Sequence, residues 1–219
     1  MARGRFISLE GGEGSGKSTQ ARRLAEALER AGRAVVVTRE PGGTPRAEQI
    51  RAVLFDRELA PASPMTEALL FNAARRDHLD GLIRPALAEG KWIVCDRFMD
   101  STRAYQGAAG GVAPEDIATL ERLCLAGLVP DVTLILDLDP GVGLARARAR
   151  QLGAAPDDRG HDPFEGRDLA FHRRLRAAYL EIAAAEPQRC VVIDAGDAEE
   201  NVHAAILAAL AARLGVEVS

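Results

Sequence analysis

The strongest constraint on this chain is a glycine-rich segment that follows a short apolar run and leads directly into a helical pattern. The segment matches G-x-x-x-x-G-K-[ST], with Gly11 and Gly16 as the anchoring glycines. Glycines let the backbone N–H groups turn inward around a phosphate with no Cβ in the way. Lys17 can place a positive charge at the β- and γ-phosphates, and the Ser18 hydroxyl can ligate Mg²⁺.

The alternative is a glycine-rich turn that binds nothing. The strand–loop–helix context favours a nucleoside triphosphate site, because the helix that starts near Lys17 adds the positive end of its dipole. The predicted donor-binding loop comprises Gly11, Gly12, Glu13, Gly14, Ser15, Gly16, Lys17, Ser18 and Thr19.

Length and composition exclude several other classes of protein. The 219 residues are long enough for one sizeable core, so residues 1–219 are expected to form a single domain. A net charge of −4 argues against a partner that is a nucleic-acid polymer or an anionic membrane. No apolar run approaches the roughly 18 residues that span a bilayer. Three widely separated cysteines and the absence of a signal-peptide pattern predict the cytoplasm.

Apolar runs alternate with helical patterns along the whole chain. The runs are rich in Val and Ile without clean alternation, as expected for strands buried on both faces. Such alternation predicts an α/β fold, a three-layer αβα sandwich around a five-stranded parallel sheet of the P-loop nucleoside triphosphate hydrolase kind. Predicted strands are Arg5–Leu9, Ala34–Thr38, Trp92–Asp96, Thr133–Asp137 and Cys190–Asp194. Predicted helices are Lys17–Ala31, Pro64–Glu89, Pro114–Leu125, Gly141–Leu152, Asp168–Ala185 and Ala198–Leu214.

Charged residues follow several of these strands, at the sheet edge where ligands of α/β folds bind. Asp96 ends a buried strand, as does the acid that holds Mg²⁺ in P-loop enzymes. Arg97 beside it can clamp a second phosphoryl group, and Arg39 is expected to face the same cleft. The alternatives are a simple Asp96–Arg97 pair that caps the strand and, around Pro41-Gly42, a tight turn with no further role.

Two further groups of residues suit a nucleotide. Phe71 and Arg75 are spaced i, i+4, so a ring that stacks on a base and a guanidinium that bonds its edge share one helix side. Periodicity alone favours a core position for Phe71. Tyr105 and Gln106 can pack on a sugar and bond a base, or can equally be a polar helix face.

Arginines also gather in the stretch that leads into the most loop-like segment of the chain. Arg146, Arg148 and Arg150 recur at spacing two, and Arg159 lies in the Gly- and Pro-rich loop that follows. A mobile arginine-bearing segment suits a phosphotransferase, since closure brings positive charge to the transition state and excludes water. We therefore predict a lid over about residues 146–166.

The order of these motifs resembles bacterial thymidylate kinases across nearly the whole chain. The most specific elements are Thr38-Arg39-Glu40-Pro41-Gly42-Gly43-Thr44, and Asp96-Arg97 followed by Ala104-Tyr105-Gln106-Gly107. The resemblance implies transfer of the γ-phosphoryl of ATP to dTMP in dTTP biosynthesis, which gives dTDP and ADP. It further implies Mg²⁺ and a homodimer.

The resemblance also implies a role for each matching residue. Lys17 and the loop amides would hold the ATP phosphates, and Ser18 with Asp96 would serve the metal. In the acceptor dTMP, Arg97 and Arg39 would hold the phosphate, and Glu13 would approach the sugar. Tyr105 would crowd the 2′ position of that sugar. The base would be contacted by Phe71, Arg75, Ser101 and Gln106.

Members of this family differ in the origin of a catalytic arginine. The variable positions of the loop, Gly12 to Ser15, include no basic residue. The chain therefore resembles the kind whose lid supplies the arginine. Arg159 matches best through Asp158-Arg159, and Arg150 is the alternative.

Two other functions remain open from the residues alone. The first is a P-loop kinase that acts on a nucleoside or a different monophosphate. The second is a nucleotide switch, although a guanine-reading N-K-x-D element is absent from the sequence.

Overall fold

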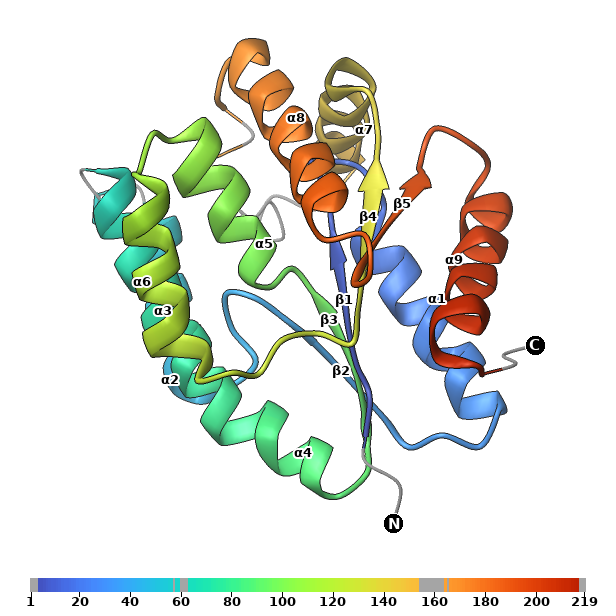
Figure 1. Ribbon diagram of the computed structural model, residues 1–219. Coiled ribbons are helices and arrows are strands. Elements are labelled where there is room, and N and C mark those ends of the chain that lie inside the picture. The colour runs from blue at the N-terminus through green and yellow to red at the C-terminus, as the bar shows by residue number, and fades with distance from the viewer. Residues whose placement is uncertain (1–3, 57, 60–62, 154–163, 165, 217–219) are drawn as a thin grey trace.

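A parallel five-stranded sheet forms the middle layer of this protein. The computed structural model describes residues 4–56, 58–59, 63–153, 164 and 166–216 (Figure 1). The strands are β1 (Phe6–Glu10), β2 (Val35–Arg39), β3 (Trp92–Asp96), β4 (Val132–Asp137) and β5 (Cys190–Asp194). All pairings are parallel and the order is β2-β3-β1-β4-β5, so the strand that precedes the glycine-rich loop lies in the centre.

Helices cover both faces of the sheet (Figure 1). Helices α1 and α9 lie on one face, and α4, α5 and α8 lie on the other with α2, α3 and α6 outside them. The α-helices are α1 (Lys17–Arg30), α2 (Pro45–Phe55), α3 (Pro64–His78), α4 (Arg84–Ala88), α5 (Met99–Thr102), α6 (Pro114–Leu125), α7 (Pro140–Gly153), α8 (Leu169–Ala185) and α9 (Glu199–Leu214). Two π-helical segments, η1 (Leu79–Ile83) and η2 (Arg103–Ala109), continue α3 and α5.

The predicted fold class is confirmed: the sheet is five-stranded and parallel, and each predicted strand lies within one residue of its observed bounds. Two helical segments were missed, α2 and the α5–η2 segment. The start of α2 carries a recognisable signal, because Pro45 is its first residue and the Thr44 hydroxyl accepts the Ala47 N–H at 3.3 Å. Only Ala47 and Leu54 of this helix are buried, so its apolar periodicity is weak.

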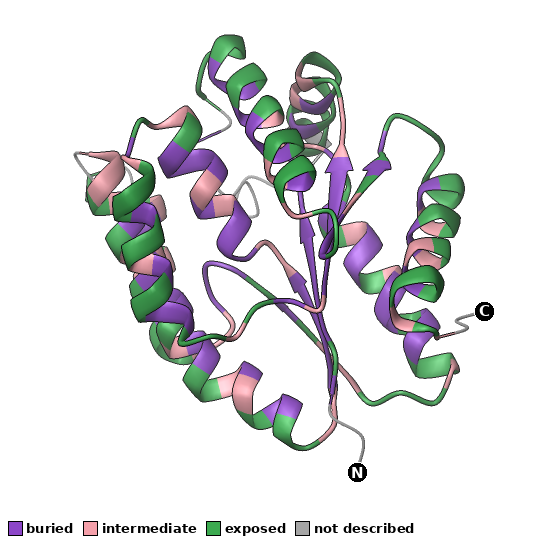
Figure 2. Ribbon diagram, viewed as in Figure 1, coloured by how far each residue is buried: buried purple, intermediate pink, exposed green. Residues whose placement is uncertain are grey.

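The core lies against both faces of the central strands: β1 is buried along its whole length, and β3 and β4 are buried except at their last residues (Figure 2). Alternate residues of β1 point to opposite faces. Ile7 and Leu9 join Leu24 and Leu28 of α1 in one cluster, whereas Phe6 joins the cluster beneath η1 and α4. No helix among the described residues is both long and apolar enough to cross a membrane.

We expect Leu28→Ala to lower the free energy of unfolding by about 2–5 kcal/mol, because the side chain is fully buried and its loss leaves a cavity. Leu152→Ala removes the same atoms from a side chain that is 79% exposed and should change stability by less than about 0.5 kcal/mol. Urea unfolding of both variants measures the difference. Equal losses would show that the α1–sheet contact is not the core of the fold.

Candidate active site

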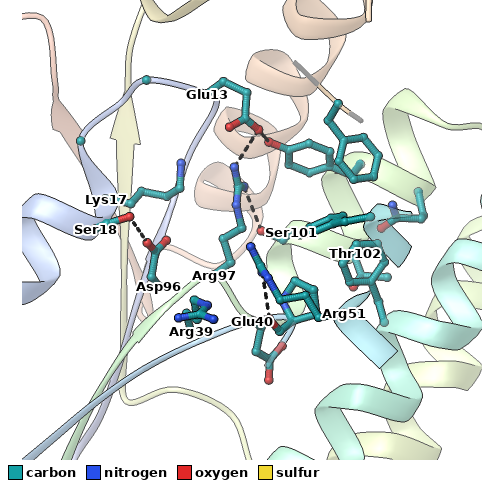
Figure 3. A pocket seen from close by; sticks show the side chains of 18 of the residues that line it. Glu13, Lys17, Ser18, Arg39, Glu40, Arg51, Asp96, Arg97, Ser101 and Thr102 are labelled. Carbon is teal, nitrogen blue, oxygen red and sulfur yellow. Dashed lines mark hydrogen bonds and ion pairs between the residues drawn. The ribbon is translucent and has the colours of Figure 1, made fainter. Parts of the chain in front are cut away.

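The carboxyl edge of the sheet holds a cleft of about 370 Å³. The pairing of β1 with β3 brings the glycine-rich loop, which follows β1, next to Asp96 and Arg97 at the end of β3. At this point the Arg97 N–H donates to Leu9 O at 2.9 Å. Residues that line the cleft are Glu13, Gly14, Gly16, Lys17, Ser18, Thr19, Arg39, Glu40, Pro41, Arg51, Phe55, Phe71, Asp96, Arg97, Ser101, Thr102, Tyr105, Gln106, Arg150 and Phe164. In Figure 3 the Arg97 side chain points toward Glu13, and Lys17 and Asp96 lie beside it.

The glycine-rich loop wraps the N-terminus of α1 as predicted. Gly14 has φ +66°, and a Cβ there would lie 2.1 Å from Gly143 O, so only glycine allows this approach. Lys17 Nζ donates to Gly12 O at 2.7 Å and Gly11 O at 3.2 Å. Burial, together with the charge of Arg97, lowers the pKa of Lys17 to about 8. This buried ammonium group lies in a loop shaped for anions.

Ser18 and Asp96 meet at the floor of the cleft. The Ser18 hydroxyl donates to Asp96 Oδ2 at 2.5 Å, which joins the first turn of α1 to the end of β3. Hydroxyl and carboxylate oxygens are ligands that Mg²⁺ accepts beside substrate phosphates and water. No three or more His, Cys, Asp or Glu side chains of the described residues form a metal-binding group. The two oxygen donors beside the glycine-rich loop would leave the other positions around Mg²⁺ to phosphate oxygens and water.

Asp96 bonds to Ser18 and Arg97 bonds to Glu13, so the two side chains are directed to separate partners rather than to each other. Arg97 has a left-handed backbone, φ 69°, which aims its side chain at the donor loop. Its Nη2 donates to Glu13 Oε1 at 2.8 Å, its Nη1 donates to Gly11 O at 3.1 Å, and the guanidinium lies 4.9 Å from the Tyr105 ring centroid.

Glu13 is held between cationic side chains in the donor loop. Burial by itself would raise the pKa of this carboxyl, but Arg97 and Lys17 outweigh burial and lower the pKa to about 2. The Tyr105 hydroxyl also donates to Glu13. The ionised carboxylate therefore connects the donor loop to the residues of β3 and η2.

Aromatic rings form the far end of the cleft. Phe71 is half-buried rather than a core residue, and its ring centroid lies 6.3 Å from that of Phe164. Phe164 also meets the edge of Tyr105, with centroids 5.0 Å apart. Gln106 lines the same end and donates to Glu67 at 3.1 Å. These rings are tilted or edge-on to one another and form an apolar surface with an amide group beside it, a combination that can contact a planar aromatic ligand.

Arg75 lies behind the wall of the cleft and is not among its lining residues. It is fully buried, and its Nε donates to Glu40 Oε2 at 2.6 Å while its other nitrogens reach Thr102 Oγ1 and Phe98 O. Burial opposes the charge, but Glu40 outweighs it and raises the pKa of Arg75. Contact between Arg75 and a base would require Arg75 to extend past these partners.

The arginines of α7 have separate positions. Arg150 lines the cleft, whereas Arg146 donates to Ala195 O at 3.0 Å in the turn after β5. Arg159 and most of the predicted lid lie outside the described residues.

Sequence reasoning missed Arg51, Phe55 and Phe164 as cleft residues. Arg51 donates to Pro41 O at 3.0 Å, and its guanidinium lies 4.4 Å from the Phe55 ring centroid. Both residues belong to α2, so missing the helix meant missing its side chains. Phe164 lies in a stretch of the sequence rich in Gly, Pro and Asp and carries no periodic signal.

The fold and the cleft together are those of a P-loop phosphotransferase. A sequence model of the thymidylate kinase family matches residues 9–206. The chain is 57% identical to a thymidylate kinase from Caulobacter vibrioides over 99% of its own length and all of that protein. It is 53% identical to one from Nitrobacter winogradskyi, with 95% and 88% of the two chains covered.

A solved structure agrees with these relatives. The crystal structure of thymidylate kinase from Ehrlichia chaffeensis superposes with a TM-score of 0.77 at 33% identity and covers 95% of this chain and all of that one. The chain belongs to the thymidylate kinase family.

Glu10, directly before the donor loop, provides a test by pH. Burial and the nearby Asp100 raise the pKa of this carboxyl from 4.5 to about 7, although Ser101, Arg97 and the Phe98 N–H oppose the rise. The folded state therefore holds the proton more tightly than the unfolded state, and stability falls as pH rises from 4.5 through 7. Glu10→Gln cannot ionise, so its stability relative to the parent should rise by up to about 3 kcal/mol between pH 5 and pH 8.5.

Urea unfolding of both proteins at the two pH values measures this change. A difference between variant and parent that stays constant with pH would contradict the assignment of the titration to Glu10.

Proposed function

We propose that the cleft binds ATP at the glycine-rich loop and dTMP beside Arg97, so that the two phosphates meet between Lys17 and Arg97. As a member of the thymidylate kinase family, the chain transfers the γ-phosphoryl group of ATP to dTMP, which gives ADP and dTDP. One observation carries the proposed geometry: Arg97 Nη2 lies 2.8 Å from Glu13 Oε1, inside the loop that bears Lys17 (Figure 3).

The chemistry needs positioning and charge neutralisation rather than a strong base. The acceptor is itself a phosphate, so its oxygen attacks without losing a proton to a side chain. Lys17 would hold the donor phosphates, and Arg97 with Arg39 would hold the acceptor phosphate. Each charge is placed before reaction, so little reorganisation is needed as negative charge shifts between the phosphates.

Mg²⁺ would be held by Ser18 and Asp96, whose oxygens already lie together at the cleft floor. When bound, it would supply positive charge to the donor phosphates. The remaining ligands would be phosphate oxygens and water, as is common for Mg²⁺.

Selection of the acceptor is assigned to the aromatic end. Phe71 would stack on thymine, with Ser101 and Gln106 near the base, and Arg75 would reach the base only by extending past Glu40 and Thr102. Tyr105 is 5% exposed and its hydroxyl is bonded to Glu13, so its ring cannot swing away from the sugar. A ribose 2′-hydroxyl would crowd that ring.

The lid arginine, the oligomeric state and the compartment are further parts of the proposal. Arg150 in the cleft supports a lid that supplies positive charge, with Arg159 as the family match. Leu69 and Leu123 are 51% and 63% exposed on the neighbouring helices α3 and α6, which supports a homodimer through that face. Three buried free thiols fit the reducing cytoplasm.

An assay of ADP release with ATP and Mg²⁺ tests the acceptor. We expect strong turnover with dTMP, weaker turnover with dUMP, and almost none with UMP or thymidine at equal concentration. UMP tests the exclusion at Tyr105, and thymidine tests the need for a phosphate at Arg97. ADP release that ignores every acceptor would instead support a nucleotide switch.

Two substitutions separate the donor and acceptor ends. Arg97→Ala should raise the KM for dTMP and lower kcat while the KM for ATP stays near the parent value. Lys17→Ala should reduce kcat by about 10²–10³-fold, as expected when a charge-stabilising group is lost. Loss of ATP binding in the Arg97 variant, or near-native turnover in the Lys17 variant, would overturn the assigned roles.

A further inference from the structure

Glu10 is a buried carboxylate that the reaction outlined above does not use. It is the last residue of β1, is fully buried, and points away from the loop that follows it toward α5 and α8. Its Oε1 accepts the Phe98 N–H at 2.8 Å and the Ser101 N–H at 3.3 Å. Its Oε2 accepts the Ser101 hydroxyl at 2.6 Å and the Tyr179 hydroxyl at 3.1 Å.

Four donors on one carboxylate have a consequence for the two hydroxyl groups. A hydroxyl has one proton to donate and lone pairs with which to accept. When Ser101 and Tyr179 both donate to Glu10, their lone pairs are free to accept from a third group.

That third group is Arg97. Arg97 Nη1 lies 3.4 Å from Ser101 Oγ and 3.5 Å from Tyr179 Oη, and these two oxygens are 3.0 Å apart. The guanidinium is a donor only, so it needs acceptors on this side. Ionised Glu10 makes these acceptors available, because it accepts the protons of both hydroxyl groups and so leaves their lone pairs facing Arg97.

Tyr179 connects this arrangement to a distant part of the chain. It lies on α8 with 2% of its surface exposed, and its ring packs in the cluster that contains Tyr105, Ile135 and Leu175. Packing sets the ring, so the hydroxyl position depends on how α8 sits against the sheet.

We propose that Glu10 and Tyr179 are positioning residues for Arg97: the carboxylate takes the hydroxyl protons of Tyr179 and Ser101, and the two oxygens orient the guanidinium that receives the acceptor phosphate. This inference rests on the role proposed above for Arg97. Neither Glu10 nor Tyr179 lines the cleft, so neither is expected to touch dTMP.

Tyr179→Phe is the sharpest test, because it removes one oxygen and keeps the ring in its cluster. We expect the KM for dTMP to rise about three- to tenfold with a lower kcat, while the KM for ATP stays unchanged. The inhibition constant of thymidine, which has no phosphate, should stay at the parent value. Native kinetics, or thymidine weakened as much as dTMP, would overturn the proposal.

Glu10→Gln tests the carboxylate, since its amide is a donor and cannot accept both hydroxyl protons. It should affect the same constants as Tyr179→Phe, and the double variant should be no worse than the poorer single one, because both act through one guanidinium. Fully additive losses would show independent roles.

Two controls keep the outcomes distinct. Glu121→Gln alters another buried carboxylate. Glu121 accepts a hydrogen bond from Arg103 Nε at 2.6 Å and does not line the cleft, so this variant should leave the KM for dTMP unchanged. Arg97→Ala, measured alongside, tests the role of Arg97 itself. A native KM for dTMP in this variant would refute the proposed function of Arg97. A raised KM in this variant, together with native kinetics in Tyr179→Phe, would refute only the positioning role of Glu10 and Tyr179.

Discussion

The hydrogen bonds between β1 and β3 bring the donor loop next to Asp96 and Arg97, the charged residues at the end of β3. Leu9 pairs with Asp96, and the next N–H along β3, that of Arg97, still donates to Leu9 O before the chain turns away. The donor loop leaves β1 one residue later. Parallel pairing therefore fixes Lys17, Asp96 and Arg97 relative to one another through backbone geometry, which is stiffer than side-chain contact. A shift of one residue would reverse the direction of both side chains at the end of β3.

Buried charge is the second organising feature, and it is arranged in connected pairs. Arg97 faces Glu13 and Arg75 faces Glu40, so each of these two buried guanidinium groups has a carboxylate partner. Glu10 differs, because its pKa of about 7 makes ionisation costly for folding. An ionised Glu10 lowers the stability of the fold, but it orients the hydroxyl groups that accept from Arg97. Functional sites commonly keep such groups at a cost in stability.

Much of the fold and part of the cleft could be predicted from local sequence. The five strands and the donor loop were found because apolar runs and glycine spacing are local signals. Helix α2 was missed because only two of its residues are buried, and with it Arg51 was missed as a cleft residue. Periodicity favours a core position for Phe71, whereas its half-buried ring packs on a core cluster with one side and lines the cleft with the other. Periodicity reports which residues avoid water in a helix and does not separate a core from a ligand-binding surface.

The sequence by itself determined which motifs the chain carries and in what order. A donor loop lies between β1 and α1, an acid and an arginine stand at the end of β3, and a family resemblance spans the chain. These follow from residue types at fixed short spacings. Only the tertiary structure decided that Arg75 lies behind the cleft wall on Glu40, and that Tyr179 reaches Glu10 from 169 residues away. Such contacts depend on how α3 and α8 pack on the sheet, and no local pattern encodes the distance between side chains that the packing brings together.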